Sequence, residues 1–552
     1  MCDKLQGMIP GKIAHDPATL DRYSRDASLF TIKPQAVAYP QSVADLSQLI
    51  RYMTEHSEEH LSLTPRAAGT DMTGGPLNES IIVDMLAFNK IIAVDPHQAT
   101  VQPGAYYRDL AAALQPLKAL LPSYPASREL CTVGGMVANN SGGEKTLAYG
   151  KTANYVQQLK VVLSDGQEYT FEKLRERELQ KKIAAGGFLG SIYQQLFDLL
   201  TQHHEQLQRA RPPVSKNSAG YALWDVWNPA AKMFDLTRLF CGSQGTLGII
   251  TEITFSLIEP KPHSKMLVIF LDDLKYLSQI IATTLTGQPE SFESYDDHTL
   301  RLALRFLPDI MKRLATNPPA GGWLTLAWRF LPEVKMILTG GIPKLVLLAE
   351  FTGDSASEVL ARARRVQQRL QRFPLKTRLI TSPTEAKKYW VMRRESFNLL
   401  REHVENKRTA PFIDDIIVRP EQLPEFLPRL NHIMAGYNLT YTIAGHMGDA
   451  NFHIIPLLDV SRPDLPDLIE SLSRKVYDLV IEFNGSITAE HNDGLIRTPF
   501  LAQMYGVEIV ELFQQVKKIF DPKDIFNPCK KVSAVGLPCG WRYATEHLIN
   551  RN

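Results

Sequence analysis

The chain has 552 residues, more than one hydrophobic core normally supports, so its length predicts two or three domains. With 44% hydrophobic and 22% charged residues, the composition is that of an ordinary folded protein rather than a disordered or fibrous one. The formal net charge of +2 supplies no broad positive field, which argues against a nucleic-acid binder.

The five cysteines are too few and too scattered for a disulfide framework, and they favour a reducing compartment. The N-terminal segment has no apolar run of signal-peptide type, and no stretch reaches the ~18 apolar residues of a membrane-spanning helix. We therefore expect a cytoplasmic protein with no transmembrane span. A peripheral position at the inner face of a membrane is left open.

The first half of the chain predicts an α/β arrangement. Apolar residues at helical spacing predict a helix that begins near Ser42. Residues 156–171 alternate around Asp165-Gly166, which is a hairpin signal, and a later β run stops at prolines near residue 262, where we place a domain boundary. Between the helix and the hairpin come four short strands, "LSLTP", "SIIVDM", "KIIAVD" and "QATVQPG", and a helix, "AYYRDLAAALQPL".

The second half restarts at residue 263 with two strand–helix units, "HSKMLVIFLDD" and "KLVLLAEFTGDSASEVLARARRVQQRL". Two such units facing one antiparallel sheet predict an α+β cap. The last section is helical, and its final long helix ends at Asp521-Pro522. In this helix an apolar residue recurs at every third position, which predicts one buried stripe of Val507, Val510, Phe513, Val516 and Ile519.

Three segments of small residues lie within the first 251 residues: "PRAAGTDMTGG" at 65–75, "CTVGGMVANNSGGEKTLAYG" at 131–150 and "CGSQGTLGIIT" at 241–251. The Rossmann fingerprint and the P-loop pattern are absent. Each segment carries many backbone N–H groups with little side-chain bulk, and such nests bind diphosphate oxygens. A single segment of this kind could be a tight turn. Three together indicate an extended dinucleotide lying along the fold.

These segments resemble the FAD-binding domain of the vanillyl-alcohol-oxidase type, also called the PCMH-type domain, over about residues 35–260. Residues 66–75 are similar to its pyrophosphate loop, "CTVGGMVANNSGG" to its second FAD segment and "GSQGTLGIITEITF" to its closing strand. The resemblance implies FAD contacts from Arg66, Ala67, Ala68, Gly69, Thr70, Asp71, Gly74, Thr132, Gly135, Asn140, Gly142, Gly143 and Ile250.

The chain departs from this family pattern at two places in the first loop. Ala67-Ala68 stand where a Gly pair is common, so the backbone there must avoid positive φ. Members with covalent flavin carry a His where this chain has Thr70. The resemblance therefore implies that FAD is held without a covalent bond.

Two histidines in "YTIAGHMGDANFHIIP", residues 441–456, form the next candidate site. His446 follows a strand at a Gly bend, and Asn451 and His453 share one face of the following strand. Two converging imidazoles could supply part of a divalent-metal site. Taken alone, such a pair is more often a hydrogen-bonded structural feature.

The stretch "SITAEHNDG", residues 486–494, predicts a short strand followed by an acid–base pair at a turn. Neighbours on a strand point to opposite sides, so Glu490 and His491 cannot do the same job. If Glu490 joins His446 and His453, the set offers three protein ligands with positions left open, as a catalytic metal needs. His491 would then be free to act as a base, because its ordinary pKa lies near physiological pH.

"GHMGDANFH", "AEHNDG", "YWVMRRE" at 389–395 and "DPKDIFNP" resemble the C-terminal FAD-linked oxidase domain of the D-lactate, glycolate and D-2-hydroxyglutarate dehydrogenases. This resemblance implies that His446, His453 and Glu490 bind Zn2+ or Mn2+ and that His491 is the base. It also implies that Arg393 pairs with the substrate carboxylate. A solvated helix face, or an ion pair with Glu395, is the plainer alternative for Arg393.

Together the resemblances predict an α+β fold, in which a PCMH-type FAD-binding domain of two α/β subdomains precedes a cap domain. The cap domain would have an antiparallel sheet and a helical C-terminal section. The expected divisions are an N-terminal segment at 1–34, the FAD-binding domain at 35–262, the cap or substrate domain at 263–528 and a tail at 529–552.

The expected activity is oxidation of a D-2-hydroxy acid to the 2-oxo acid, with hydride transfer to FAD. Asn492-Asp493 replace the family's Gly and its neighbour after the base, which could change how the loop holds His491. Ile413 stands where some members have a Lys, which makes a dicarboxylate substrate less secure. Residues 304–346 are longer than expected and could cover the substrate entrance or dock a partner.

Two other functions stay open. One is a flavoprotein electron-transfer or assembly subunit with a decayed substrate site, and the other is flavin oxidation of a phenol or sugar alcohol. Cys529 and Cys539 cannot build a four-cysteine cluster alone, so we expect a separate electron acceptor: a quinone, an electron-transfer flavoprotein or an iron–sulfur protein. Direct use of O2 and a homodimeric assembly are also left open.

Overall fold

The computed structural model describes residues 6–7, 9, 12–297, 300–301, 341–403, 408–534 and 539–548. These residues form two compact units. The first unit contains residues 1–143, 150–260 and 486–552, and the second contains residues 144–149 and 261–485. Most of the segment expected to be an insertion, 304–346, lies outside the described residues.

The first unit contains a four-stranded sheet of order β1-β2-β4-β3, in which β4 runs parallel to both β2 and β3. Helix α3 (Val43–Glu55) packs its apolar face on the same core as this sheet. It begins where the sequence predicts, because Ser42 and Asp45 form a capping box. The strands are β1 (Ile13–Ala14), β2 (Ala36–Ala38), β3 (Leu63–Arg66) and β4 (Ile81–Asp84).

A second, antiparallel sheet of the first unit has seven strands in the order β5-β6-β11-β7-β8-β10-β9. The predicted hairpin is confirmed: β7 pairs with β8, and Gly166 takes the positive φ of 72° that the turn requires. The strands are β5 (Ile91–Val94), β6 (Gln98–Val101), β7 (Val156–Val162), β8 (Glu168–Arg175), β9 (Trp227–Asn228), β10 (Met233–Asp235) and β11 (Ile249–Ser256).

Helices of the first unit come from both ends of the chain. They are α2 (Pro17–Tyr23), α4 (Tyr107–Leu114), α5 (Val133–Asn139), α7 (Glu176–Ala184), α8 (Gly187–Gln202), α9 (His204–Ala210), α10 (Thr237–Phe240), α19 (Gly494–Arg497), α20 (Leu501–Tyr505), α21 (Val507–Phe520) and α22 (Trp541–Glu546). After α21 the backbone N–H of Leu63 in β3 donates to Ile525 (2.7 Å), and the N–H of Asn527 donates back to Leu63 (2.9 Å). The motif "DPKDIFNP" therefore lies beside β3.

The stripe predicted on α21 was wrong. Val507 is 65% exposed, and the buried apolar residues of the helix are Ile509, Leu512, Phe513, Val516 and Phe520. A spacing of three drifts around a helix that has 3.6 residues per turn, whereas the observed set lies at i, i+3, i+4, i+7 and i+11 and stays on one face. The helix ends as predicted, with Asp521 following its last residue.

The second unit contains an antiparallel sheet of order β15-β12-β14-β13-β18-β19-β16, with β17 also paired to β19. It confirms the expected cap architecture, because β12 and β14 are each followed by a helix, α11 and α15. The strands are β12 (His263–Leu271), β13 (Ser291–Asp296), β14 (Leu345–Gly353), β15 (Lys376–Ile380), β16 (Arg408–Thr409), β17 (Ile416–Ile417), β18 (Thr440–His446) and β19 (Asn451–Leu458).

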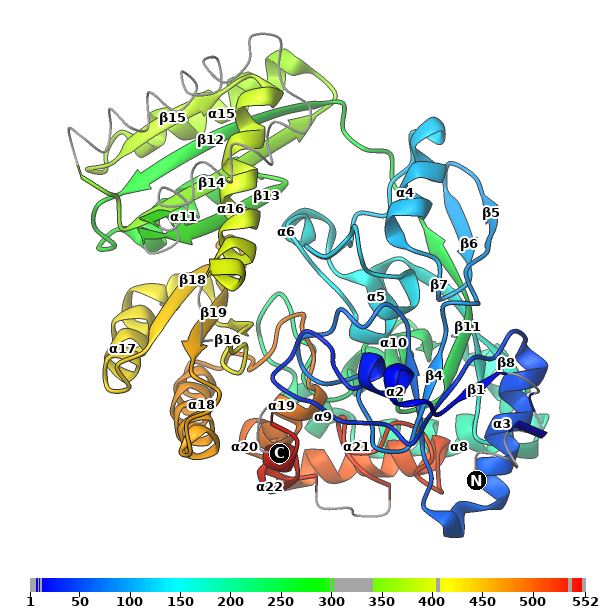
Figure 1. Cartoon of the computed structure of the whole chain (residues 1–552). Coiled ribbons are helices and arrows are strands. Elements are labelled where there is room, and N and C mark those ends of the chain that lie inside the picture. Colours follow the sequence, from blue (N-terminus) through cyan, green and yellow to red (C-terminus); the bar gives the residue numbers. More distant parts are fainter. Residues whose placement is uncertain are drawn as a thin grey trace. The chain divides into compact units, whose positions relative to one another are not determined.

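Helices cover this sheet at several places (Figure 1). Helix α15 packs on β12 and β14, helix α16 on β12 and β15, and helices α17 and α18 on each other. Short helix α6 comes from the end of the second small-residue segment, 131–150, and packs on β13. The helices are α6 (Thr146–Tyr149), α11 (Leu277–Leu285), α15 (Ala356–Leu370), α16 (Pro383–His403), α17 (Leu423–Ala435) and α18 (Leu465–Glu482).

Cysteine pairing differs from the sequence expectation at one place. Cys529 and Cys539 form a disulfide, whereas Cys131 and Cys241 are free thiols buried in the first unit. Among the helices of the described residues, none combines the length and hydropathy that crossing a membrane requires.

Candidate active site

The three small-residue segments meet one another inside the first unit. Asn139 of the second segment donates through Nδ2 to Asp71 of the first, at 3.2 Å. Gln244 of the third segment donates its backbone N–H to Ala138 (2.9 Å) and its side-chain Nε2 to Thr73 (3.5 Å). Segments as much as 170 residues apart in the chain are thus brought to one place, as a single extended ligand would require.

Asp71 shapes the first loop from within. Its Oδ2 accepts hydrogen bonds from the backbone N–H groups of Thr73 (3.0 Å) and Gly75 (2.8 Å). The positive φ angles of this loop fall on Gly69 (67°) and Gly74 (82°). Ala67 and Ala68 therefore avoid positive φ, as the sequence predicted.

Arg66 is directed toward the N-terminal segment of its own unit. Its guanidinium donates to the carbonyl oxygens of Tyr23 (3.0 Å) and Arg25 (2.7 Å) and lies 5.3 Å from the centre of the Tyr23 ring. Arg66 is buried, whereas residues 67–71 are half-buried. Arg66 thus anchors the loop, and the small residues that follow it are the part that a ligand can reach.

Two glycines of the second segment differ in why they must be small. A Cβ on Gly143 would lie 2.3 Å from the carbonyl oxygen of Tyr124, so packing inside the protein requires glycine there. A Cβ on Gly135 would meet nothing closer than Thr132 Oγ1 at 3.5 Å, and Gly135 is exposed. Thr132 itself caps α5 by accepting the Gly135 N–H (3.3 Å). Room for a ligand thus exists at Gly135.

The remaining predicted FAD contacts lie on the same unit. Asn140 has a positive φ of 50°, and its Oδ1 accepts the N–H of Ala153 (2.9 Å), so this side chain holds the turn after α5. Gly142 is buried, and Ile250 lies in β11 opposite Val161. Thr70 is half-buried in the first loop. Their contacts with FAD remain predictions.

The stretch at residues 486–494 does not contain the short strand that the sequence predicts at its start. Their backbone groups pair instead with side chains and loops: Lys151 Nζ donates to the Ala489 carbonyl (2.6 Å), and the N–H of Ser218 donates to the Thr488 carbonyl (2.9 Å). A buried Lys thus replaces a strand ladder. Glu490 and His491 are therefore not neighbours on a strand, as the prediction of opposite directions assumed, although the two residues do have different surroundings.

Glu490 is buried and lies against a Lys. Its Oε2 is 3.2 Å from Lys216 Nζ, and the two side chains are 6% and 1% exposed. Opposite charges so deeply buried stabilise each other, because neither is tolerated alone in the interior. His491 is half-buried in the same unit.

The departure Asn492-Asp493 is accommodated by a network of its own. Asn492 has a φ of 72°, a conformation that suits the family's Gly and that Asn tolerates, and its Nδ2 donates to the Gly242 carbonyl (2.9 Å). Asp493 accepts the Gly220 N–H (2.8 Å) and pairs with Lys531 Nζ (2.7 Å). Lys531 also donates to Asn492 Oδ1 (2.8 Å). Burial lowers the pKa of Lys531, and the charge of Asp493 opposes this effect.

His446 and His453 converge in the second unit, as the sequence predicts. They lie on the hairpin β18–β19, where His446 faces Asn451 and His453 faces Ala444. The two imidazole rings are 5.1 Å apart, centre to centre, and nearly perpendicular at 87°.

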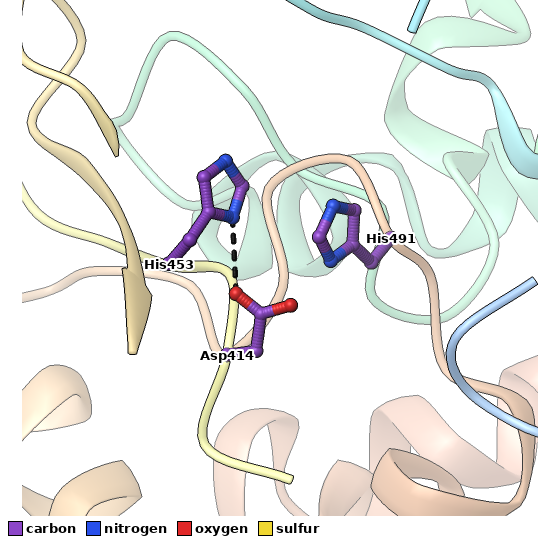
Figure 2. Close-up of side chains that lie close together, drawn as sticks. All are labelled: Asp414, His453 and His491. Atoms are coloured by element: carbon purple, nitrogen blue, oxygen red, sulfur yellow. Dashed lines mark hydrogen bonds and ion pairs between the residues drawn. The ribbon is translucent and has the colours of Figure 1, made fainter. Parts of the chain in front are cut away.

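Each of these histidines is hydrogen-bonded to a buried carboxylate. His446 Nδ1 lies 2.6 Å from Glu293 Oε1, and His453 Nδ1 lies 3.0 Å from Asp414 Oδ1. Figure 2 shows the second of these bonds, drawn together with His491 of the first unit. With Nδ1 engaged, Nε2 is the atom by which each ring can coordinate a metal.

Arg393 does not lie on a solvated helix face. It stands in α16 with its side chain 16% exposed, and one of its terminal nitrogens is 3.2 Å from Glu293 Oε2. The ion-pair partner that the structure shows is thus Glu293. Nε of Arg393 is buried and has no hydrogen-bond partner among the residues that the structure describes.

Four charged residues of these sites were not predicted from the sequence: Glu293, Asp414, Lys216 and Lys531. The sequence could have indicated Glu293, because a lone Glu inside the strand "SFESY" needs a charged or hydrogen-bonding partner if that strand is buried. The other three become visible only when segments far apart in the chain are brought together.

The residues present fit both expected groups. For FAD, the half-buried loop 67–71 and Gly135 present backbone with little side-chain bulk. For a divalent metal, two imidazoles with Nδ1 held by carboxylates are donors of the kind that Zn2+ and Mn2+ take. Glu490 belongs to the first unit and the two histidines to the second, so the three-residue set remains a prediction.

Both halves of the chain are similar to known proteins. Residues 34–172 match the FAD binding domain, and residues 260–531 match the C-terminal domain of FAD linked oxidases. The chain is 28% identical over 538 residues to a D-2-hydroxyglutarate dehydrogenase of Pseudomonas putida, covering 95% of this chain but only 51% of that protein. It is 27% identical over 520 residues to the glycolate oxidase subunit GlcD of Bacillus subtilis, covering 92% of this chain and 91% of that protein.

Solved structures agree on the fold. The 4-ethylphenol oxidase of Gulosibacter chungangensis matches with a TM-score of 0.67 at 16% identity, covering 96% of each chain. The chain spans about half the length of the D-2-hydroxyglutarate dehydrogenase of P. putida. The chain thus carries an FAD binding domain and the C-terminal domain of FAD linked oxidases, and its fold is similar to that of the 4-ethylphenol oxidase.

Proposed function

We propose that this chain oxidises a D-2-hydroxy acid of the lactate, glycolate or 2-hydroxyglutarate class to the 2-oxo acid. One observation carries the proposal: in a chain with an FAD binding domain, two histidines converge and each is held through Nδ1 by a buried carboxylate. Oxidation of a phenol or a sugar alcohol does not call for such a set. The names of the relatives, which refer to hydroxy acids, support the same substrate class.

His446, His453 and Glu490 would hold Zn2+ or Mn2+, and that ion would supply a Lewis acid that lowers the pKa of the substrate hydroxyl. FAD, held without a covalent bond beside Thr70, would supply the acceptor for the hydride that leaves C2. His491 takes the hydroxyl proton as the C2–H bond breaks with its electron pair. General-base help of this kind is worth about 10²–10⁴ in rate.

Arg393 binds the substrate carboxylate in this proposal. Glu293 holds one of its terminal nitrogens at 3.2 Å. A guanidinium can clamp a carboxylate with two parallel hydrogen bonds, which fixes the position of C2. Ile413 is fully buried, so it does not replace the Lys that some family members use for a second carboxylate.

The rival role, an electron-transfer or assembly subunit with a decayed site, rested on the altered turn after His491 and on Ile413, which stands where some family members have a Lys. The side chains of that turn are hydrogen-bonded, since Asn492 and Asp493 both contact Lys531 Nζ. A separate electron acceptor remains part of the proposal: a quinone, an electron-transfer flavoprotein or an iron–sulfur protein. A cytoplasmic position, or one at the inner face of a membrane, and a homodimeric assembly also remain proposals.

The test is reduction of an artificial dye by the FAD-loaded protein, supplied in turn with D- and L-2-hydroxy acids. We expect turnover with at least one D-acid, loss of turnover after EDTA treatment and recovery on adding Zn2+ or Mn2+. A p-alkylphenol and a sugar alcohol serve as controls for the other reaction class. Turnover with these controls alone, or none with any acid, would contradict the proposal.

A further inference from the structure

We infer that Glu293 is a positioning residue that orients the metal-binding His446 and the substrate-binding Arg393 together. The inference rests on the proposed function and adds to it a residue that lies outside the motifs. Its basis is that one buried carboxylate has two oxygens, and each holds a different member of the site.

Glu293 is held firmly in place. It lies in the middle of β13 (Ser291–Asp296), whose six residues are all buried, and it is itself 2% exposed. In the sheet it stands directly opposite His446 of the neighbouring strand β18. The carboxylate therefore approaches the imidazole across a fixed strand pair, and not from a mobile loop.

The two oxygens are divided between two partners. Oε1 is 2.6 Å from His446 Nδ1, and Oε2 is 3.2 Å from a terminal nitrogen of Arg393 in α16. Hydrogen bonds that involve an ionised group are shorter and stronger than neutral ones. A carboxylate buried this deeply is costly without such partners, so both bonds belong to one arrangement.

The bond to His446 decides which ring nitrogen coordinates. An imidazole that donates its Nδ1 proton to a carboxylate presents Nε2 to the metal, and the carboxylate makes that nitrogen a better donor. The bond to Arg393 fixes one edge of the guanidinium. The ligand nitrogen and the carboxylate clamp are thus set relative to each other by a single side chain.

The strand supplies its own control residue. Glu290 precedes β13 and is also a buried carboxylate, 4% exposed, but it accepts hydrogen bonds from Lys145 (2.7 Å) and Tyr149 (2.9 Å). The Glu290→Gln variant removes a buried negative charge from the same sheet without touching His446 or Arg393. Any general effect of neutralising a buried Glu beside β13 should therefore appear in both variants.

The first readout is metal affinity, measured on FAD-loaded protein by competition for Zn2+ and Mn2+ with a chelator of known affinity. We expect Glu293→Gln to bind metal about 10- to 100-fold more weakly than wild type, with the same FAD content. We expect Glu290→Gln to bind metal as wild type does. If Glu293→Gln gives no flavoprotein, Glu293→Asp takes its place, with a loss in the same direction.

The second readout is the substrate. Arg393→Lys should raise KM, because Lys cannot form two parallel hydrogen bonds to a carboxylate. In the double variant with Glu293→Gln, the rise in KM should be smaller than the product of the rises in the two single variants, because both changes disturb the same ion pair. If Glu293 had a purely structural role, Glu293→Gln would lower FAD content and thermal stability, and its effect on KM would not depend on Arg393.

Different results would contradict the proposed function and the role of Glu293. A wild-type protein that binds neither metal, or turns over no 2-hydroxy acid, contradicts the proposed function. The role of Glu293 alone is overturned by a different set of results. In that case the wild type binds metal and turns over a 2-hydroxy acid, and Glu293→Gln has the same metal affinity as Glu290→Gln. The effects of Glu293→Gln and Arg393→Lys on KM would then also simply multiply in the double variant.

Discussion

Lys531 Nζ lies 2.7 Å from Asp493 Oδ2, and both side chains are fully buried. The pair joins the turn after His491 to a residue that the sequence assigns to a C-terminal tail. The same ammonium donates to the Gly220 carbonyl (2.7 Å) and to Asn492. Lys531 thus holds the segment that carries Glu490 and His491 on the first unit.

Replacing Lys531 with Met should strongly destabilise the first unit. The change leaves Asp493 buried without its positive partner, and breaking a buried ion pair from one side costs about 3–5 kcal/mol. We expect a clear fall in the thermal unfolding temperature of the FAD-loaded protein. Adding Asp493→Asn should restore part of the loss, and Lys523→Met, at an exposed position, should change nothing. Equal unfolding temperatures for Lys531→Met and wild type would contradict this.

Substitutions at Gly143 and Gly135 should distinguish a glycine required for packing from one required for FAD contact. Gly143→Ala should destabilise the apoprotein, because its Cβ would lie 2.3 Å from a backbone oxygen. Gly135→Ala should leave apoprotein stability unchanged but weaken FAD binding if FAD approaches the backbone there, since the protein itself has room for the Cβ. FAD titration by fluorescence and thermal unfolding of the apoprotein measure both. Unchanged FAD affinity in Gly135→Ala would remove that contact.

The stability of the first unit should depend on pH through Asp26. Burial, and next the negative charge of Asp71, raise the pKa of Asp26 from 3.8 to about 7, although the positive charge of Arg66 acts in the other direction. The folded state therefore holds this proton more tightly than the unfolded state. The resulting stabilisation is complete below pH about 4 and is lost as the pH rises through about 7, with a slope of up to about 1.4 kcal/mol per pH unit.

Asp26→Asn should remove this dependence and still accept the Gly74 N–H, which Asp26 bonds at 3.1 Å. The variant should exceed wild type in stability at pH 8 and lose that advantage at pH 5. Urea unfolding of both proteins at several pH values, at one FAD concentration, makes the comparison. Parallel pH curves for the two proteins would show that Asp26 does not titrate in this range.

His491→Ala should reduce turnover by about 10²–10⁴ if the side chain is the base. FAD content should stay at the wild-type level, because the predicted FAD contacts lie on other segments. His97→Ala, at an exposed position in the same unit, is the control. Full turnover in His491→Ala would remove the base assignment.

FAD should leave the protein on denaturation. Thr70 stands where family members with covalent flavin carry a His. A Thr side chain has a hydroxyl in place of the nucleophilic ring nitrogen of His. Acid precipitation followed by absorbance of the supernatant should therefore recover all the flavin. Yellow colour retained in the washed pellet would show a covalent bond elsewhere.

Local signals in the sequence were sufficient for individual elements. Ser42 and Asp45 specify the start of α3 through side-chain hydrogen bonds that span three residues, and Asp165-Gly166 specify a hairpin through backbone conformation. Glycine at the left-handed positions Gly69 and Gly74 is likewise a local requirement. The family motifs added the FAD segments and the two histidines, whose convergence follows from one strand pairing.

The sequence failed where the outcome depends on distant partners. The stretch at residues 486–494 predicts a short strand at its start, but Lys151 and Ser218 bond the carbonyls of Ala489 and Thr488, so no ladder forms there. The buried face of α21 depended on what covers the helix, which a repeat of three does not reveal. Residues 144–149 were counted with the FAD segments, yet they belong to the compact unit of β13.

The sequence by itself therefore indicated the two FAD-linked oxidase domains, most of the elements in their order and the residues of the candidate site, whose roles stay predictions. Only the tertiary structure decided which charges pair, because Glu293 with His446 and Lys531 with Asp493 are 153 and 38 residues apart. The physical reason is that a buried charge is tolerated only beside a partner, and folding brings that partner from anywhere in the chain.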